Sequence, residues 1–503
     1  MDWLKLKSGS DVRGKACGDG AMITEEVARA LGMTFAHKLA REQGKEINQI
    51  TIALGRDSRV TGEKLLAATA DGILRAGAQV LDFDMCTTPA MFMAILTPGF
   101  QPNGSIMMTA SHHPWDRNGL KFFTPKGGIE SREVEELLAA AQSLRPLEKE
   151  PTGKYEKRAF LPEYMNQLAE RIRQGLGTQE EKPLAGLHIA VDAGNGAGGF
   201  YATLLQSLGA DTQGSQFLEP DGMFPNHIPN PENPEAIASL RNAVLNSGAD
   251  LGVIFDTDCD RAAIVGADGQ EINRNRLIAL ISAILLEKEQ GITIVTDSVT
   301  SSGLKKFISA HGGEHYRFKR GYRNVIDEAI RLNQQGVHCP LAIETSGHAA
   351  LEENHFLDDG MYLVTVLIVK AMEMKREGKT LGSLIADLAE PVESREIRLN
   401  ITAEDFRAKG QEAIALTLAA AEKHPEWQVA PDNREGIRIS FDLAGQADAG
   451  WFLLRLSVHD PVMPLNCESD VPGGVKYMLQ ALYQELEGLE GVNLSPLAAA
   501  IQE

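Results

Sequence analysis

The sequence has little of what marks secreted, zinc-binding or membrane proteins. Cysteine is scarce and shows no CxxC spacing, which argues for free thiols in a reducing compartment and against disulfides or a structural zinc. The five residues are Cys17, Cys86, Cys259, Cys339 and Cys467. The opening MDWLKLKSGSDVRG lacks the apolar core of a signal peptide, and the longest apolar run, LIALISAILL at 277–286, is half as long as a membrane span. We therefore predict a cytoplasmic protein without a membrane partner.

Positive charge is also scarce, since 49 Lys and Arg stand against 69 Asp and Glu, giving a net charge of -20. Nucleic acids and anionic membranes both favour a basic surface, so neither is an expected partner. Small phosphates remain compatible, because they need only a local cluster of cations. Hydrophobic residues at 43% and charged residues at 23% are typical of globular proteins. A chain of 503 residues predicts roughly three or four domains.

Three segments share one design, beginning near residues 50, 187 and 292. Each starts as a short β-branched strand, turns through Asp with Gly or Ser, and continues as an amphipathic helix. Such α/β units build mostly parallel sheets, and ligands collect at the carboxyl ends of the strands. After residue 391 the pattern changes to a long helix, two strands, GIRISFDL and GWFLLRLSV, and a final helix. This tail predicts a separate α+β domain.

Ser111 follows a predicted strand in MMTASHHPWDRNGLKFF, 107–123. A serine that leaves a strand into such a turn would be exposed at the end of a sheet, where strained turns often present nucleophiles. The alternative is a turn or N-cap serine. The GxSxG pattern of a serine hydrolase is absent. These residues alone therefore leave a nucleophile and a structural serine both open.

Three aspartates, Asp256, Asp258 and Asp260, alternate at the end of an apolar strand in VIFDTDCDRAAIV. Carboxylates at this spacing can converge on one hard cation such as Mg²⁺. An EF-hand loop would require Gly at Arg261 and Glu at Ala267, so that type of site is excluded. A solvated acidic turn is the alternative. We favour the metal, because the flanking strands are too apolar to keep three like charges together without a cation.

A third strand end, in LAIETSGHAALEE, carries Glu344, Ser346 and His348. A carboxylate and a hydroxyl suit paired sugar hydroxyls, and a histidine can transfer protons near neutral pH. For this stretch alone, a buried glutamate and histidine with satisfied hydrogen bonds is the safer explanation.

Taken together, these stretches resemble the signature loops of the α-D-phosphohexomutase superfamily, over essentially the whole chain. TASHHPWDRNGLK is similar to the serine loop TASHNP followed by NGxK, DTDCDR to the metal loop DGDGDR, and IETSGH to the sugar loop GExSGH. GSDVRG, which contains Arg13, is similar to the amino-terminal SGIRG. Further agreement comes from GRDSR at 55–59, DAGNGAGG at 192–199, DGMFPNHIPNPENPE at 221–235, and Lys319 in FKRGY.

The resemblance implies a fold and a mechanism. It implies three similar α/β domains with mixed, mostly parallel sheets and a C-terminal α+β domain, arranged around a central cleft. The expected domains are a phosphoserine-loop domain at 1–152, a metal-binding domain at 153–272, a sugar-recognition domain at 273–390 and a phosphate-clamp domain at 391–503. Ser111 would carry a phosphoryl group and exchange it with sugar hydroxyls, with hexose 1,6-bisphosphate as activator.

The resemblance also assigns residue roles. The implied catalytic residues are Ser111, Lys121 as a cationic proton carrier, His348, Arg13 and Arg261. The implied metal ligands for Mg²⁺ are Asp256, Asp258, Asp260 and the phosphorylated Ser111. The implied substrate-binding residues are Glu344, Ser346, Lys319, Arg455 and Ser457.

The sequence departs from the family pattern in the last domain. The family loop RxSGTEP or RxSNTTP is matched by RLSVHDPVMPLNCES, which keeps Arg455, Ser457 and Pro461. Val458, His459 and Asp460 fill the remaining positions, and Asn466 stands where many members have a second arginine. An added carboxylate and a lost cation should weaken binding of a phosphate dianion. The alternative is neutral sequence drift that leaves phosphate binding unchanged.

Smaller departures affect the other loops. His113 replaces an asparagine of the serine loop, Ile343 replaces the glycine before Glu344, and Thr257 and Cys259 replace the glycines of the metal loop. We expect a metal loop of altered shape that keeps its carboxylates.

The leading hypothesis is a phosphohexomutase acting on glucose or mannose phosphates. A hexose 1,6-bisphosphate synthase on the same scaffold is the alternative, because a weakened clamp would release the bisphosphate. A catalytically silent sugar-phosphate binding protein is a third hypothesis, and the retained serine, lysine and aspartates argue against it. No oligomeric state is predicted.

Overall fold

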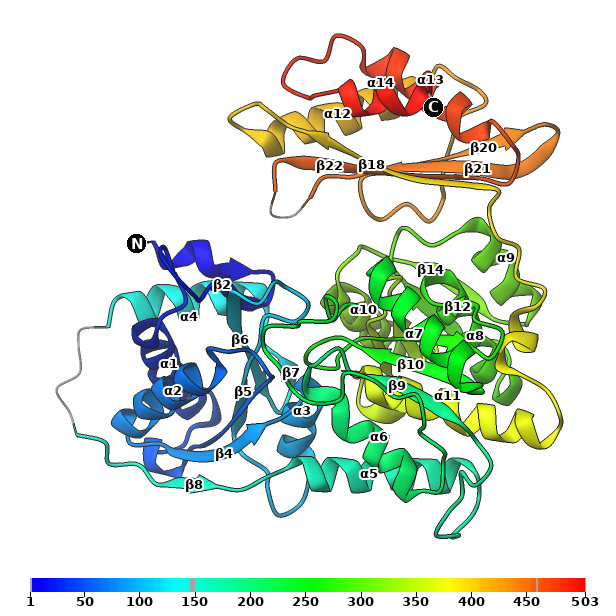
Figure 1. The fold of residues 1–503 in the computed structure, drawn as a ribbon. Helices are drawn as coiled ribbons and strands as arrows, with labels where there is room; N and C mark the ends of the chain where they lie inside the picture. Colours follow the sequence, from blue (N-terminus) through cyan, green and yellow to red (C-terminus); the bar gives the residue numbers. More distant parts are fainter. Residues whose placement is uncertain (1, 145–149, 458–459, 503) are drawn as a thin grey trace. The chain divides into compact units, whose positions relative to one another are not determined.

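The computed structural model describes residues 2–144, 150–457 and 460–502. The chain divides into two compact units. The first contains the chain up to Asn273 with 346–349 and 357–381, and the second contains Arg274–Thr345, Ala350–Phe356 and the chain from Gly382 onward. Four β-sheets follow one another along the described residues (Figure 1).

The first sheet has the order β1-β2-β6-β5-β3-β4-β8, with β7 paired to β6. The strands β5, β3, β4 and β8 are parallel, and β6 runs antiparallel to β5. Helices α1, α2 and α4 cover one face and α3 covers the other (Figure 1). The strands are β1 (Lys7–Ser8), β2 (Asp11–Lys15), β3 (Thr51–Arg56), β4 (Gln79–Met85), β5 (Gly104–Met108), β6 (Arg117–Thr124), β7 (Gly127–Gly128) and β8 (Tyr155–Lys157). The helices are α1 (Glu25–Gln43), α2 (Gly62–Ala76), α3 (Thr88–Leu96) and α4 (Ser131–Gln142).

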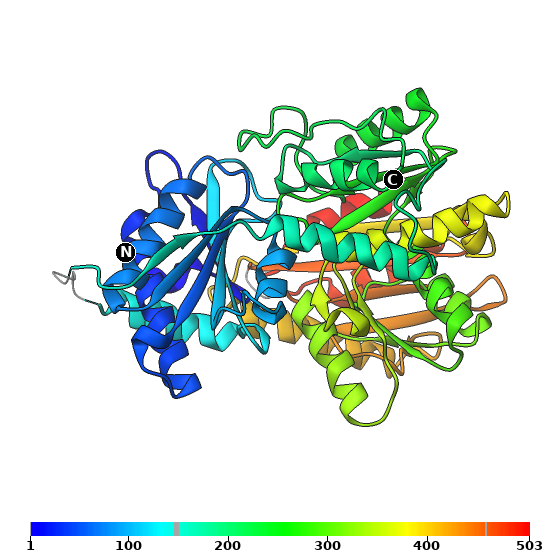
Figure 2. The ribbon, with the colours of Figure 1, turned by 90° about the horizontal axis from the view of Figure 1, so that it is seen from below.

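The second sheet, also in the first unit, has the order β12-β11-β10-β9. β9 and β10 are parallel, and β10 and β11 are antiparallel. The strands are β9 (Ile189–Asp192), β10 (Leu251–Phe255), β11 (Ala262–Gly266) and β12 (Glu271–Ile272). The helices are α5 (Leu161–Gly175), α6 (Phe200–Ser207), α7 (Pro234–Ser247) and α11 (Gly360–Arg376). α5 packs along α11 (Figure 2). The two helices approach closely at Gly175, where an added Cβ would meet Val369 at 2.8 Å.

Local signals set the helix ends. At the start of α7 the Asn233 side chain accepts N–H groups of Glu235 and Ala236, and Pro234 occupies the first turn, where no intrahelical N–H bond is lost. Gly248 ends the same helix in the left-handed conformation, with φ of 70°.

The third and fourth sheets introduce the elements of the second unit. β14, β13 and β15 are parallel neighbours. They are β13 (Thr293–Thr296), β14 (Glu314–Arg317) and β15 (Leu341–Ile343), with helices α8 (Arg274–Lys288), α9 (Ser302–Ala310) and α10 (Tyr322–Gln334). Two short strands, β16 (Ala349–Leu351) and β17 (Leu357–Asp358), come next in the chain.

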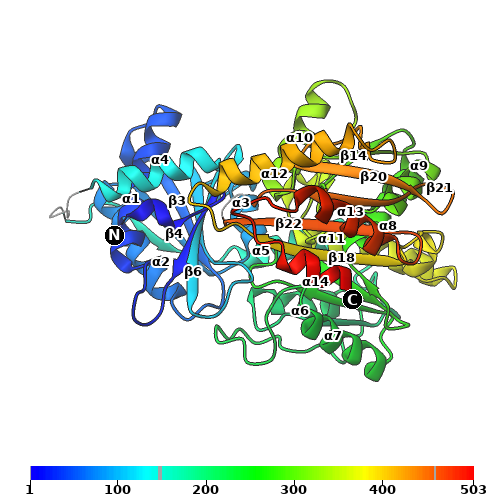
Figure 3. The same ribbon diagram turned by 90° about the horizontal axis from the view of Figure 1, so that it is seen from above.

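The fourth sheet is antiparallel, with the order β18-β22-β21-β20-β19. Helices α12, α13 and α14 cover one of its faces (Figure 3). The rings of Trp427, Phe441 and Phe452 meet in its core. The strands are β18 (Glu393–Asn400), β19 (Gln428–Val429), β20 (Ile437–Leu443), β21 (Gln446–Leu454) and β22 (Val462–Ser469). The helices are α12 (Phe406–Ala421), α13 (Gly474–Leu486) and α14 (Ser495–Gln502).

The predicted fold class is confirmed: three α/β domains with mixed sheets precede a sheet-rich C-terminal domain. The domain limits stay predictions, and β8 pairs with β4 although it lies beyond residue 152. The apolar run 277–286 falls inside α8, and no helix among the described residues is long and apolar enough to cross a membrane. All five cysteines are free.

Candidate active site

The fold brings the predicted serine and aspartate loops together within the first unit. Ser111 follows β5, and Asp256 follows β10. The Ser111 hydroxyl donates to Asp256 Oδ2 at 2.9 Å, across 145 residues of sequence. It accepts a hydrogen bond from Arg261 Nη2 at 3.0 Å. The candidate nucleophile therefore lies between a carboxylate and a guanidinium.

The expectation that Ser111 is exposed is wrong, because the residue is only 2% exposed. Asp256 and Arg261 both hydrogen-bond to the hydroxyl, and His112 Nδ1 lies 3.2 Å from it. Ser111 also has φ of 50°, the left-handed region that residues other than glycine rarely adopt. Its N–H donates to Thr109 Oγ1 at 2.8 Å, which helps to fix this conformation.

Arg59 hydrogen-bonds to the main chain of the serine loop and was not among the predicted site residues. Its buried guanidinium donates to the carbonyls of His113 at 2.6 Å and of Pro114 and Arg117 at 2.8 Å, and also to the Ser111 carbonyl. The motif GRDSR was visible in the sequence, but nothing local indicated that its second arginine reaches a loop more than 50 residues away.

The three aspartates form a buried cluster that fits a metal ion. Each offers one oxygen, and these oxygens lie within 4.8 Å of one another. Burial and the charge of Asp260 raise the pKa of Asp256 to about 8. Among the described residues, Asp258 Oδ1 and Asp260 Oδ1 have no hydrogen-bond partner although both are buried. Buried, unsatisfied carboxylate oxygens at this spacing are what a cation with oxygen ligands requires.

The metal loop keeps a left-handed turn without glycine. Cys259 has φ of 67°, at a position where the family pattern has glycine. Its side chain is fully buried, and its Sγ lies 3.7 Å from the Asp256 carbonyl. Cys259 thus adopts a backbone conformation that glycine adopts more readily.

Lys121 on β6 reaches the same cluster from the first sheet. Its Nζ donates to Asp258 Oδ2 at 2.8 Å and also to Asp260 Oδ2. Burial alone would lower its pKa, but the charges of Asp258 and Asp260 outweigh burial and raise the pKa well above its ordinary value. In this arrangement Lys121 is a fixed cation beside the serine loop.

His348 lies at the edge of the cluster, in the part of the chain that belongs to the first unit. Its Nδ1 lies 2.5 Å from Asp358 Oδ2 and 4.0 Å from Asp260 Oδ1. Burial lowers its pKa, but the charges of Asp358 and Asp260 prevail and raise it to about 9. His348 is thus an imidazolium near neutral pH. The sequence analysis did not single out Asp358, because Asp358 and His348 do not form a recognised sequence motif.

Arg13 lies on β2, opposite Gly119 on the strand that carries Lys121. Its Nη2 pairs with Asp11 Oδ2 at 2.6 Å. The structure thus brings six predicted residues together around Ser111 and places Arg13 on the neighbouring strand. The six are Lys121, Asp256, Asp258, Asp260, Arg261 and His348.

The predicted sugar loop is divided between the units, with Ser346 in the first and Glu344 in the second. Both are buried. Glu344 Oε1 accepts the N–H of Gly321 at 2.6 Å, which joins it to the loop of Lys319. Lys319 itself is exposed. Sequence reasoning did not single out Asp297, whose Oδ2 accepts the Thr345 hydroxyl at 2.7 Å beside this loop.

The predicted phosphate clamp lies at the turn from β21 to β22, in the second unit. The N–H of Arg455 donates to Pro464 at 3.1 Å, and that of Ser457 donates to Val462 at 2.9 Å. Ser457 Oγ accepts the N–H of Asp460 at 3.3 Å. Val458 and His459 lie outside the described residues. Burial lowers the pKa of Arg455.

Asn466 on β22 donates from Nδ2 to Glu396 Oε2 at 3.2 Å. The position that carries a second arginine in many family members therefore faces a carboxylate here.

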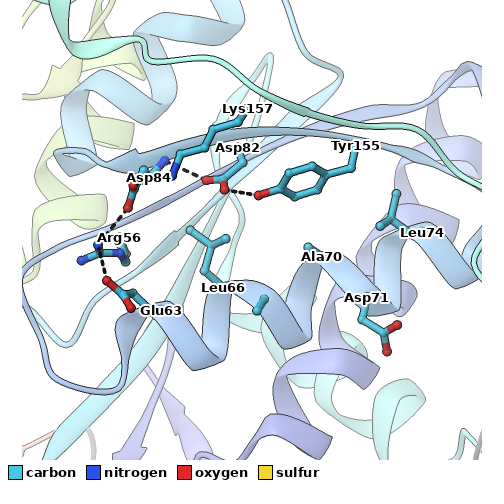
Figure 4. Close-up of a pocket in the computed structure, with 11 residues that line it drawn as sticks. Arg56, Glu63, Leu66, Ala70, Asp71, Leu74, Asp82, Asp84, Tyr155 and Lys157 are labelled. Carbon is cyan, nitrogen blue, oxygen red and sulfur yellow. Dashed lines mark hydrogen bonds and ion pairs between the residues drawn. The ribbon is translucent and has the colours of Figure 1, made fainter.

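A separate surface pocket of about 510 Å³ lies along α2 and β8 (Figure 4). Both of its cations are paired with carboxylates that also line it. Arg56 pairs with Glu63 at 2.9 Å and with Asp84 at 2.8 Å, and Lys157 pairs with Asp84 at 2.8 Å. None of the predicted site residues lines it, so this pocket is not the candidate active site.

Comparison with known proteins gives consistent results. Models described as phosphoglucomutase/phosphomannomutase, alpha/beta/alpha domains I, II and III, match residues 5–144, 162–269 and 273–392. A phosphomannomutase of Escherichia coli K12 is 32% identical over 499 residues, covering 94% of this chain and 97% of the relative. A phosphoglucomutase of Neisseria gonorrhoeae is 29% identical, covering 93% of each chain.

Solved structures agree. The crystal structure of a phosphoglucomutase/phosphomannomutase family protein from Burkholderia thailandensis matches with a TM-score of 0.80 and 27% identity, over 98% of this chain and 99% of the other.

Proposed function

Because the chain belongs to the phosphoglucomutase/phosphomannomutase family, we propose that it interconverts hexose 1-phosphates and hexose 6-phosphates, with glucose and mannose phosphates as substrates. The observation that carries this proposal is the buried Ser111 hydroxyl held between Asp256 and Arg261, with Lys121 in the same cluster. Binding alone would not require a hydroxyl surrounded by charges of both signs.

We propose that Ser111 carries the phosphoryl group. In the first transfer, the bond between phosphorus and the Ser111 oxygen breaks and a bond to a sugar hydroxyl oxygen forms. The proton that the sugar hydroxyl loses is balanced by the proton that the departing Ser111 oxygen gains, so the serine hydroxyl is restored. The resulting hexose 1,6-bisphosphate rebinds in the opposite orientation and returns its other phosphoryl group to Ser111. Arg261 and Lys121 offset the negative charge on the transferring group, which is the principal contribution a protein makes to phosphoryl transfer.

His348 is proposed as the proton donor to the sugar oxygen when the sugar leaves, since its imidazolium form is favoured beside Asp358. In the opposite direction the neutral imidazole that this donation leaves receives the proton from the sugar hydroxyl. Lys121 contributes as a cation in this scheme, and Arg13 adds positive charge from β2. Hexose 1,6-bisphosphate is the proposed activator, because it can phosphorylate Ser111 directly.

We propose Mg²⁺ as the metal, held by Asp256, Asp258 and Asp260 with an oxygen of phosphorylated Ser111. When bound, it would neutralise charge on the phosphoryl oxygens. Glu344 and Ser346 are proposed to bind sugar hydroxyls, and Lys319, Arg455 and Ser457 to bind the phosphate that is not transferred. The free thiols of all five cysteines support a reducing compartment such as the cytoplasm.

Phosphorus NMR tests the proposed function. Purified enzyme with Mg²⁺ and a trace of glucose 1,6-bisphosphate should convert glucose 1-phosphate or mannose 1-phosphate into the corresponding 6-phosphate. Absence of any 6-phosphate from either sugar, with enzyme that is folded and phosphorylated on Ser111, would contradict it.

Release of hexose 1,6-bisphosphate as a product is a second candidate function, favoured by one observation. Asn466 faces Glu396 in the predicted clamp, and Asp460 is exposed beside Ser457. Acidic groups there disfavour retention of a phosphate dianion. The chain would then transfer its phosphoryl group and lose the bisphosphate before the second transfer.

We expect Asn466→Arg to raise the ratio of mutase turnover to bisphosphate release by about tenfold, because the new guanidinium offsets Glu396 and can pair with the dianion. Phosphorus NMR of both products over many turnovers gives the ratio. Asn466→Gln is the matched control, since it changes length without adding charge. An equal ratio in both variants would mean that this position does not govern bisphosphate retention.

A further inference from the structure

A second pocket, of about 210 Å³, lies wholly within the second unit, between the start of α9 and the strands of the C-terminal sheet. None of the predicted catalytic or substrate-binding residues lines it. Its charged lining residues are three cations and two anions: Lys305, Arg317, Arg438, Asp432 and Asp448. Positive charge is therefore in excess by one, in a chain whose net charge is -20.

Two of the cations are buried and rigidly held. Arg438 is 4% exposed, donates to the carbonyls of Ser298 at 2.9 Å and Thr300 at 3.2 Å, and lies 3.6 Å from the centre of the Trp451 ring. Arg317 is also 4% exposed and donates to the Ser301 carbonyl at 2.9 Å. Fixed guanidinium groups can bind an anion without first being ordered.

The cations of the pocket lie close to one another. Asp432 Oδ2 lies 2.6 Å from Arg317 Nη1 and 3.6 Å from Lys305 Nζ, so one carboxylate serves two cations. Burial and the charge of Arg317 lower the pKa of Arg438 well below its ordinary value and outweigh the opposing charges of Asp432, Glu468 and Asp448. An additional anion in the pocket would relieve this repulsion.

The pocket is also lined by a largely buried serine whose hydroxyl has no partner among the described residues. Ser302 is 6% exposed and lines the pocket, and its side chain makes no hydrogen bond to any part of the chain that the structure describes. It is the first residue of α9, a nine-residue helix whose Leu304 N–H is capped by the Ser301 hydroxyl. The amino end of a helix favours anions, and the free hydroxyl adds a donor there.

We propose that this pocket binds a small oxyanion of the phosphate class, at a site separate from the candidate active site. The hydrogen-bond donors would be Lys305, Arg317 and the Ser302 hydroxyl. Arg438 would add positive charge to the pocket. The ligand is inorganic phosphate or the phosphate group of a sugar ester, which share this chemistry. Because the pocket is lined by α9 on one side and by β20 on the other, the bound anion would link the third sheet's domain to the C-terminal sheet.

Hydrogen–deuterium exchange of the full-length enzyme tests the site. Inorganic phosphate or glucose 6-phosphate should slow exchange in peptides covering 298–306 and 428–440, and the concentration dependence gives an affinity for each. Protection by both, or by one of them, supports the site and identifies the source of the phosphate group. Protection of neither segment by either compound would overturn the proposal.

Variants of two neighbouring lysines distinguish phosphate bound in this pocket from phosphate bound elsewhere in the enzyme. Lys305→Ala should weaken the protection at least about fivefold, since it removes a charged donor of the pocket. Lys306→Ala is the control, because Lys306 has similar exposure but lies 3.5 Å from Asp470 and does not line the pocket. Ser302→Ala should also weaken protection. Identical behaviour of the Lys305 and Lys306 variants would show that the protection arises at another phosphate site.

Discussion

Replacing Ser111 by alanine is expected to lower hexose-phosphate turnover by about 10⁴-fold or more, because the proposed phosphoryl carrier is removed. The fold should persist. The lost hydroxyl makes hydrogen bonds to Asp256 and Arg261, whose net contribution to the free energy of unfolding is about 1 kcal/mol. Turnover of glucose 1-phosphate measures the loss of activity, and thermal unfolding measured on the same preparation shows whether the fold is intact.

Ser105→Ala provides a matched control for this variant. Ser105 is a buried serine on β5, six positions before Ser111, and its hydroxyl donates to the Met91 carbonyl at 2.8 Å. Its replacement should leave turnover within a few-fold of the wild type. Near-wild-type turnover in a clean Ser111→Ala preparation would remove Ser111 from the mechanism.

Replacing Asp258 by asparagine should have the second largest effect. It removes one of three charges available to a cation, so Mg²⁺ affinity should fall at least about tenfold and turnover about a hundredfold or more. Folding should not suffer in proportion, because the change also reduces repulsion among three buried carboxylates. Calorimetric titration with Mg²⁺, beside turnover and unfolding measurements, distinguishes these effects.

Asp268→Asn is the corresponding control. Asp268 is an exposed aspartate in the turn between β11 and β12, and its Oδ1 accepts the Gln270 N–H at 3.0 Å. This variant should bind Mg²⁺ as the wild type does. If Asp258→Asn also binds Mg²⁺ with unchanged affinity, the aspartate cluster is not the metal site.

Strand pattern predicted the α/β units and the position of Ser111 and Asp256 after buried strands, β5 and β10. The two strands belong to different sheets, so the meeting of their loops did not follow from strand pattern and was expected only from the family resemblance. The exposure of Ser111 was predicted wrongly, since the groups that cover its hydroxyl, Asp256 and Arg261, come from residues 145 and 150 positions away. Local pattern carries no information about such contacts.

Some site residues left no readable signal. Asp358 pairs with His348, yet the distance in sequence between these two residues is not one that is typical of metal ligands or of an acid–base pair. Arg59 supports the serine loop through main-chain carbonyls, which have no sequence signature. The altered shape of the loop expected from the loss of glycine at Cys259 stays a prediction; in this chain Cys259 has φ of 67° in a fully buried position. Packing can thus impose a backbone conformation that residue preference disfavours.

The most direct test of the central claim is the location and fate of a transferred phosphoryl group. Enzyme incubated with glucose 1,6-bisphosphate carrying labelled phosphate should become labelled on Ser111, as read by peptide mass spectrometry. A chase with unlabelled glucose 1-phosphate should then move the label from Ser111 into glucose 1,6-bisphosphate. Label on another residue, or label on Ser111 that the chase does not remove, would contradict the account.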